Sequence, residues 1–447
     1  MKMQLFALLL IFALLLSGCA AGEPAPQVYS AGFGCKELPV PEKSDQPLYI
    51  AGYNNGKEIT GVLDAQQARA LWLDDGSTSI VLIVVDCVGL SSATVKQIRQ
   101  RLAAFCRRTD CDSVNVISTH THAGVDTLGL WGPVAISGKN DAFMETVIAG
   151  AVQAAEEAYA NRTAGTLCYS TTKTYGLQRD SRDPQIFDNR LYQLCFTPDD
   201  GSKNGIRLFS FAAHAEALRS ENTLVSRDYP GAVCDIIKAQ TGDDAIYLPG
   251  AIGGLIMTPV LCGEPFDAKE NLRLTGEKIA SFALSAPEGE VLSPAIGLSR
   301  VEFEVELDNT LFKYYKFLGI LENEGRRSLS GQYYLQTELT VLRLGQVTLA
   351  LLPGEVFPEL ISRASLSGDP KPLREIAADY GVENFMVVGL ANDELGYILP
   401  PSAHMLDEEL PYFREAEGDH YEETNSVGVH CAHALAQAFE KALQTLK

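Results

Sequence analysis

The chain has 447 residues, with 36 lysines and arginines against 57 aspartates and glutamates, so its formal net charge is −21. A charge this negative disfavours binding to nucleic acid or to an anionic membrane surface. The ten cysteines form no C-x-x-C pair, which argues against a zinc site built from thiolates.

The first 18 residues are typical of an export signal. Lys2 is followed by an apolar run over residues 5–16, and the sequence LSGC then ends on Cys19. The run is shorter than the ~20 residues that a spanning helix needs, which favours cleavage over an N-terminal membrane anchor. The cysteine at this position indicates a bacterial lipoprotein, with palmitate or a similar lipid on Cys19 and residues 19–28 as a tether. The predicted location is therefore the extracytoplasmic face of the cell envelope.

Strands alternate with helices along the rest of the chain, without an internal linker or repeat. Apolar patterning predicts strands at 79–86, 113–118, 205–214, 245–250 and 384–393, and helices at 91–105, 141–160, 229–240 and 426–446. A hairpin is predicted over 337–355, turned at Gly345 and Gln346, with a helix starting at Val356. This order predicts an α/β (α+β) fold in which residues 29–447 form one large catalytic domain, with mixed sheets flanked by helices.

Nine cysteines remain after Cys19, an odd number for an exported protein. Cys87 and Cys195 lie inside apolar runs and are predicted to be small core residues. Cys106 and Cys111 are close enough in the sequence for a local disulfide.

Two histidines, His120 and His122, follow the strand predicted at 113–118. Residues i and i+2 of a strand point to the same face, so we expect the two side by side, roughly 6.6 Å apart. His214 and Glu355 also lie at the ends of predicted strands, where ligands gather in α/β sheets. The H-x-H spacing suits one histidine on a metal with the other beside it, both on one metal, or two hydrogen-bonded histidines without a metal. The sequence contains neither H-x-H-x-D-H nor H-E-x-x-H at this point.

Several stretches resemble, in order, the sequence blocks of the neutral/alkaline (non-lysosomal) ceramidase family. They are AGFGCKELPVP (31–41), VLDAQQARALWLDDG (62–76), IVLIVVDCVGLS (80–91), STHTHAG (118–124), FSFAAHAEAL (209–218), SRDYPG (226–231), LLPGEVF (351–357) and GLANDELGYI (389–398). Ala123 replaces the serine that follows the histidines in the family signature. The C-terminal immunoglobulin-like domain of that family is not expected in this chain.

The resemblance implies an amide hydrolase with one zinc ion per chain. It implies that His120, His214 and Glu355 are zinc ligands, and that Tyr397 is a weak fourth ligand or a donor to the oxyanion. It leaves His122 as a catalytic neighbour that hydrogen-bonds the scissile carbonyl or gives a proton to the leaving group. Two imidazoles and a carboxylate leave a zinc position open for water, which ionises near neutral pH.

Two further positions bear on the substrate. Arg179 resembles the family's arginine segment and is expected to hold a polar part of the substrate, with a surface ion pair as the alternative. The family block N-Q-G-D-V-S-P-N, whose serine is assigned a catalytic role, corresponds to residues 248–255 here. Gly253 replaces that serine, so a serine nucleophile is missing whereas a metal-bound water mechanism is retained.

The predicted function is therefore zinc-dependent hydrolysis of an amide, in a small molecule or a lipid, by a metal-bound water. The missing serine suggests two alternatives, an ester-specific hydrolase and a non-catalytic ceramidase-like lipoprotein. Phosphoester hydrolysis would need more carboxylates, and Asp228 is the only additional acid expected near a histidine block. The sequence leaves the oligomeric state and the identity of the substrate open.

Overall fold

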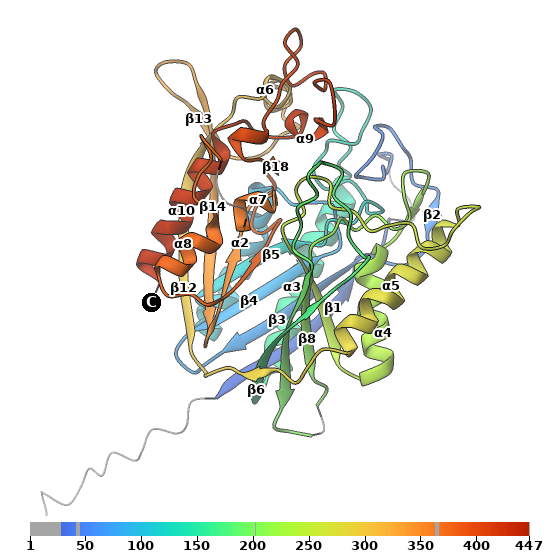
Figure 1. Ribbon diagram of the computed structural model, residues 1–447. Helices are drawn as coiled ribbons and strands as arrows, with labels where there is room; N and C mark the ends of the chain where they lie inside the picture. The colour runs from blue at the N-terminus through green and yellow to red at the C-terminus, as the bar shows by residue number, and fades with distance from the viewer. Residues whose placement is uncertain (1–27, 42–44, 202, 363–365, 447) are drawn as a thin grey trace, which may run out of the picture.

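The computed structural model describes residues 28–41, 45–201, 203–362 and 366–446. The predicted signal peptide, Cys19 and nearly all of the tether lie outside these residues. Two mixed β-sheets pack face to face between two layers of helices, as Figure 1 shows, and the α/β fold expected from the sequence is confirmed. Among the described helices, none combines the length and the apolar character needed to cross a lipid bilayer.

The larger sheet contains nine strands in the described part of the chain. Their order is β10 (Asp244–Pro249), β8 (Ile206–Phe211), β7 (Arg190–Pro198), β6 (Thr163–Lys173), β1 (Tyr29–Glu37), β3 (Gln67–Asp74), β4 (Ser79–Val85) and β5 (Ser113–Ser118), with β11 (Glu290–Val291) paired to β6. The pairs β4–β5 and β8–β10 are parallel and the others antiparallel. Every residue of β4 is buried, as its continuous apolar sequence predicts for a strand covered on both faces.

Helices cover the outer face of this sheet in two groups. They are α2 (Ser92–Thr109) with α3 (Asp141–Ala160), packed on β3 and β4, and α4 (Asp228–Thr241) with α5 (Ala268–Leu284), packed on β8 and β10. Helix α2 begins where the Ser91 side chain accepts a hydrogen bond from the backbone N–H of Thr94. Its apolar stripe from Val95 to Phe105 is buried, as the sequence spacing predicts.

The smaller sheet contains β12 (Ile296–Glu306), β14 (Tyr333–Leu344), β15 (Val347–Leu351) and β17 (Asn384–Val388), with β13 (Gly325–Arg327) paired to β14. Leu344 pairs with Val347, which confirms the predicted two-residue turn of the hairpin. The outer face of this sheet is covered by α7 (Glu359–Ser362), α8 (Leu373–Asp379) and α10 (Cys431–Thr445). The inner faces of the two sheets share a core, to which Leu82 and Leu194 contribute from one side and Leu349 and Met386 from the other.

Three expectations for the C-terminal half of the chain and one for the cysteines are corrected. The hairpin strand ends at Leu351, so Glu355 lies beyond it, and the helix expected from Val356 begins at Glu359, the first residue of α7. The last helix begins at Cys431 instead of residue 426, because residues 425–427 hydrogen-bond to the backbone of Tyr397 and Asp308. All nine described cysteines are free, so the local disulfide does not form.

Two short ladders extend beyond the main sheets, β16 (Glu355–Val356) with β18 (Tyr397–Ile398) and β2 (Gly61–Val62) with β9 (Leu224–Val225). The remaining described elements are helix α6 (Thr310–Phe317), helix α9 (Tyr421–Thr424) and a 3-10 turn at Pro401–Ala403. Figure 1 shows β18, α6 and α9 together at the top of the molecule, whereas β1 begins at the bottom. Phe312 of α6, Tyr397 of β18 and Tyr421 of α9 line one cavity at this end of the molecule.

Candidate metal centre

His120 and His122 lie in the loop that follows β5. The strand ends at Ser118, and His120 has a positive φ of 62°, so the strand alternation expected for the pair does not apply. The left-handed residue turns the two rings toward each other, and their Nε2 atoms are 3.1 Å apart. Residues other than glycine rarely adopt this conformation, and such strain is concentrated at functional sites.

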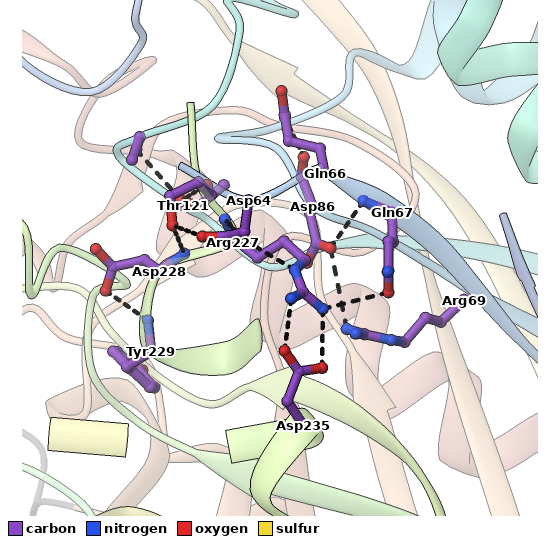
Figure 2. Close-up of polar contacts among 12 residues, drawn as sticks. Asp64, Gln66, Gln67, Arg69, Asp86, Thr121, Arg227, Asp228, Tyr229 and Asp235 are labelled. Carbon is purple, nitrogen blue, oxygen red and sulfur yellow. Dashed lines mark hydrogen bonds and ion pairs between the residues drawn. The ribbon is translucent and has the colours of Figure 1, made fainter. Parts of the chain in front are cut away.

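A polar network around the buried side chain of Arg227 supports this loop (Figure 2). The Thr121 hydroxyl donates to the carbonyl of Ser226 at 3.0 Å. The next residue, Arg227, forms ion pairs with Asp64 at 2.9 Å and with Asp235 at 2.7 Å. The network therefore ties the histidine loop to the N-terminal end of α4.

Replacing Arg227 by alanine is expected to lower the free energy of unfolding by about 2 kcal/mol, the range for lost hydrogen bonds to charged partners. Urea denaturation would measure this loss. Arg273→Ala is the control, because its ion pairs on α5 are exposed and contribute less than about 1 kcal/mol. Equal stabilities of the two variants would contradict the supporting role of Arg227.

The other predicted ligands come from different elements. His214 lies three residues after the end of β8, and the ladder of β16 with β18 pairs Glu355 directly with Tyr397. A glycine with positive φ precedes each partner, Gly354 at 123° and Gly396 at 78°. A Cβ on either glycine would meet a backbone carbonyl oxygen, at 2.6 and 2.0 Å respectively. These glycines allow the backbone to approach closely enough for the two functional side chains to meet.

The side chains converge on one carboxylate oxygen. Glu355 Oε2 lies 3.3 Å from His120 Nε2 and 2.9 Å from His214 Nε2. The Tyr397 hydroxyl is 3.2 Å from His214 Nε2. Donor atoms held at about 2.0–2.1 Å by a tetrahedral zinc ion lie roughly 3.3 Å from one another. These separations therefore suit a zinc site.

The outer nitrogens of the two predicted histidine ligands bind backbone carbonyls. His120 Nδ1 lies 2.6 Å from the carbonyl oxygen of Val88, and His214 Nδ1 lies 3.0 Å from that of Ile256. A carbonyl only accepts, so both rings donate their Nδ1–H to it, and with a metal bound at the centre each ring would present the lone pair of Nε2. Metal-ligating histidines are usually held in this way. The donor set present therefore fits a zinc ion.

The electrostatics of the centre agree with this fit. Burial raises the pKa of Glu355, but His120 and His214 outweigh it, and the net shift is downward. Burial lowers the pKa of His214, but its hydrogen bond to Glu355 gives a net upward shift. Burial, with the charges of the two neighbouring histidines, lowers the pKa of His122 well below its usual range. The carboxylate is thus held ionised beside imidazole nitrogens, as a cation site requires.

His122 admits two roles at this centre. The potential ligand atoms of His120, His122 and His214 all lie within 4.8 Å of one another, so the three buried histidines could hold a metal together. Alternatively, His120, His214 and Glu355 bind the ion and His122 stands beside it.

The centre opens into a cavity of about 340 Å³. Around the metal centre the lining contains His120, His122, Glu355 and Tyr397. An apolar part contains Leu128, Leu130, Trp131, Leu311, Phe312, Tyr315, Leu321 and Leu395, and further polar side chains come from Tyr53, Asn54, Asn55, Ser91, Glu322, Asn323, Glu394, Tyr421 and Asn425. The described lining includes neither lysine nor arginine. The cavity therefore suits a molecule with an apolar chain next to the reacting group and without a strong negative charge.

Arg179 does not join this cavity. Its side chain is exposed, its backbone pairs with Met257, and it is absent from the described lining. Glu394 lines the cavity instead, and sequence reasoning missed it. Burial and the negative charge of Glu355 raise the pKa of Glu394 well above its usual range, and its Oε2 has no hydrogen-bond partner among the described residues.

A second acid near a histidine was also missed. The statement that Asp228 is the only additional acid near a histidine block is wrong, because Glu216 follows His214 by two residues and lies beside His122. The spacing H-A-E was the available signal. Asp228 itself accepts hydrogen bonds from the backbone N–H groups of Ala217 and Leu218 and so supports this segment.

Comparison with known proteins identifies relatives of this chain. Residues 45–260 match the family model described as neutral/alkaline non-lysosomal ceramidase, N-terminal, which confirms the predicted resemblance. The crystal structure of neutral ceramidase from Pseudomonas aeruginosa aligns with a TM-score of 0.72 at 16% identity, covering 93% of this chain and 74% of that chain. A structure of a ceramidase complexed with C2 aligns with a TM-score of 0.70 at 17% identity, covering 93% of this chain and 75% of that one. Curated protein sequences gave no match.

Proposed function

We propose that this chain is a zinc-dependent hydrolase of N-acyl amides, with lipid amides as the substrate class, because residues 45–260 match the family model of the neutral/alkaline non-lysosomal ceramidases. The family and the fold together imply an amide hydrolase. The observation that supports the zinc proposal most directly is the convergence of His120 Nε2 and His214 Nε2 on Glu355 Oε2.

In the proposed mechanism, His120, His214 and Glu355 hold one zinc ion. When bound there, zinc would lower the pKa of a coordinated water and polarise the scissile carbonyl. The Tyr397 hydroxyl donates a hydrogen bond to the oxyanion that forms as water attacks the carbonyl carbon. His122 transfers a proton to the amide nitrogen as the C–N bond breaks, so that the amine leaves in neutral form.

The cavity supports an apolar acyl group in the substrate. Its wall of leucine and aromatic side chains lies next to the metal centre, and each methylene group buried there contributes about 0.8 kcal/mol. This preference follows from the wall and does not require the serine that Gly253 replaces.

The proposed catalytic domain spans residues 29–447, because the centre needs both halves of the chain. His120 and His214 follow strands of the larger sheet, whereas Glu355 and Tyr397 come from the ladder beside the smaller one. The proposed location is the extracytoplasmic face of the cell envelope, with lipid on Cys19, as the N-terminal sequence indicates.

Removal of zinc with a chelator is expected to abolish hydrolysis of N-acyl substrates, and added zinc should restore it. The assay would compare ceramides of increasing acyl length, N-acyl amino acids and matched acyl esters, with metal content measured on the same samples. Amide turnover that rises with acyl length supports the proposal. Turnover of esters alone would establish the ester-specific alternative, and zinc binding without any turnover would establish the non-catalytic one.

A further inference from the structure

The ring of His122 has one nitrogen without a hydrogen bond. Its Nε2 faces the centre, 3.1 Å from His120 Nε2. Its Nδ1 is buried and has no hydrogen-bond partner among the described residues. Oε2 of Glu216 lies 3.7 Å from Nδ1.

Backbone pairing explains why Glu216 lies there. The N–H of His122 donates to the carbonyl of Ala215 at 2.9 Å, and Thr121 forms a parallel bridge with Ala215. The loop after β5 and the segment after β8 therefore run together, and the residue after Ala215 lies beside His122. The side chain of Glu216 is only 4% exposed, so its carboxylate is directed into the protein.

The remaining partners of Glu216 keep its carboxylate in place. Arg219 donates to Oε1 at 3.2 Å and offsets the buried charge. The hydroxyl of Tyr53 donates to Oε2 at 2.6 Å, and the Tyr53 ring meets the His122 ring edge to face at 5.1 Å between centroids. A carboxylate oxygen accepts two hydrogen bonds, so Oε2 retains a site for a second donor. Catalytic hydrogen bonds are often long before substrate binds, and 3.7 Å is within reach of a small rotation of the ring.

We propose that Glu216 is a positioning residue that accepts the Nδ1–H of His122 and thereby keeps the lone pair of His122 Nε2 directed at the reacting atoms. A neutral imidazole carries one N–H, so the partner of one nitrogen decides the state of the other. This inference rests on the proposed amide hydrolysis. In that reaction, Nε2 takes a proton from the attacking water as the C–O bond forms. It then gives that proton to the amide nitrogen as the C–N bond breaks, and Glu216 itself gains no proton.

A double-mutant cycle tests whether Glu216 acts through His122. Glu216→Leu is expected to lower kcat about 100-fold, the lower end of general acid–base contributions, with KM and zinc content nearly unchanged. In the His122→Ala background the same substitution should change kcat less than about twofold, because the group that Glu216 positions is gone. Equal losses in both backgrounds would overturn the proposal.

Two further variants separate positioning from folding. Glu216→Gln retains an acceptor oxygen and is expected to recover part of the lost kcat. Glu221→Gln is the matched control, because this exposed acid lies on the same segment, and its kcat should equal that of the wild type. Thermal denaturation of each variant would show that the compared proteins are folded, and a Gln variant as impaired as the Leu variant would contradict the acceptor role.

The tautomer of His122 can be read without any substrate. The chain has only seven histidines, so an NMR spectrum of protein labelled with ¹⁵N-histidine contains few ring signals. The signals that disappear in His122→Ala are those of His122. We expect the His122 proton on Nδ1 in the zinc-loaded wild type and a shift toward Nε2 in Glu216→Leu. A proton on Nε2 in the wild type would overturn the proposal. Failure of zinc-dependent turnover would instead count against the proposed function, and the two failures are distinguishable.

Discussion

Replacing Glu355 by alanine is expected to abolish zinc binding and amide hydrolysis together. Its Oε2 is the shared neighbour of His120 Nε2 at 3.3 Å and of His214 Nε2 at 2.9 Å, so the variant loses the only predicted carboxylate ligand. Loss of an outer-shell partner already costs 10–100-fold in metal affinity or activity, so we expect a fall of more than about 100-fold. Metal analysis of the purified protein and an N-acyl amide assay would measure both effects.

Glu277→Ala is the matched control for this experiment. Glu277 is an exposed acid on α5 that pairs with Arg273 at 2.6 Å, and its loss should leave zinc content and turnover unchanged. Glu355→Gln keeps the shape of the side chain and removes its charge, so it isolates the electrostatic part of the effect. Full zinc occupancy in Glu355→Ala would show that the three histidines alone form the metal site.

Introducing serine at position 253 is expected to damage the centre, although the family has a serine there. A Cβ on Gly253 would lie 2.4 Å from Phe357 Cδ2, 2.7 Å from the Phe357 nitrogen and 2.8 Å from the Glu355 carbonyl oxygen. Two of these atoms belong to the backbone, so the strand that carries Glu355 must move. We expect Gly253→Ser to lower the free energy of unfolding by about 3 kcal/mol, the upper end for over-packing, and to weaken zinc binding.

Two variants identify the cause of that loss. Gly253→Ala should be as unstable as Gly253→Ser, because the Cβ and not the hydroxyl makes the contacts. Gly201→Ser should be harmless, because a Cβ at that exposed position has no atom within 4 Å. Denaturation curves and metal analysis would measure these differences. A stable Gly253→Ser protein with increased turnover would mean that the serine mechanism can be restored, which contradicts the role proposed for the metal site.

Some expectations failed because they assumed ideal local geometry. His120 and His122 were expected on one face of a strand, yet the strand ends at Ser118 and His120 adopts a φ of 62°. The two rings meet because the backbone turns. Arg179 carries a charge that suits substrate binding, but it is exposed and lies outside the described lining of the cavity, so its role stays a prediction.

The sequence by itself determined the alternation of strands and helices and the residues that converge at the centre. Apolar periodicity and turn residues predicted strand β4, helix α2 and the hairpin of β14 with β15. These signals act between residues that are only a few positions apart in the sequence. His120, His214, Glu355 and Tyr397 were predicted from the resemblance of their sequence blocks to the ceramidase family, and their residue types agree with those that can serve a zinc site.

Only the tertiary structure decided how these residues meet. The ladder of β16 with β18 joins Glu355 to Tyr397, and the pairing of Thr121 with Ala215 brings Glu216 to His122. The close fit of Phe357 against Gly253 likewise depends on segments about a hundred residues apart. Local periodicity cannot specify such contacts, because each depends on where two distant backbones lie and on how much space their side chains leave between them.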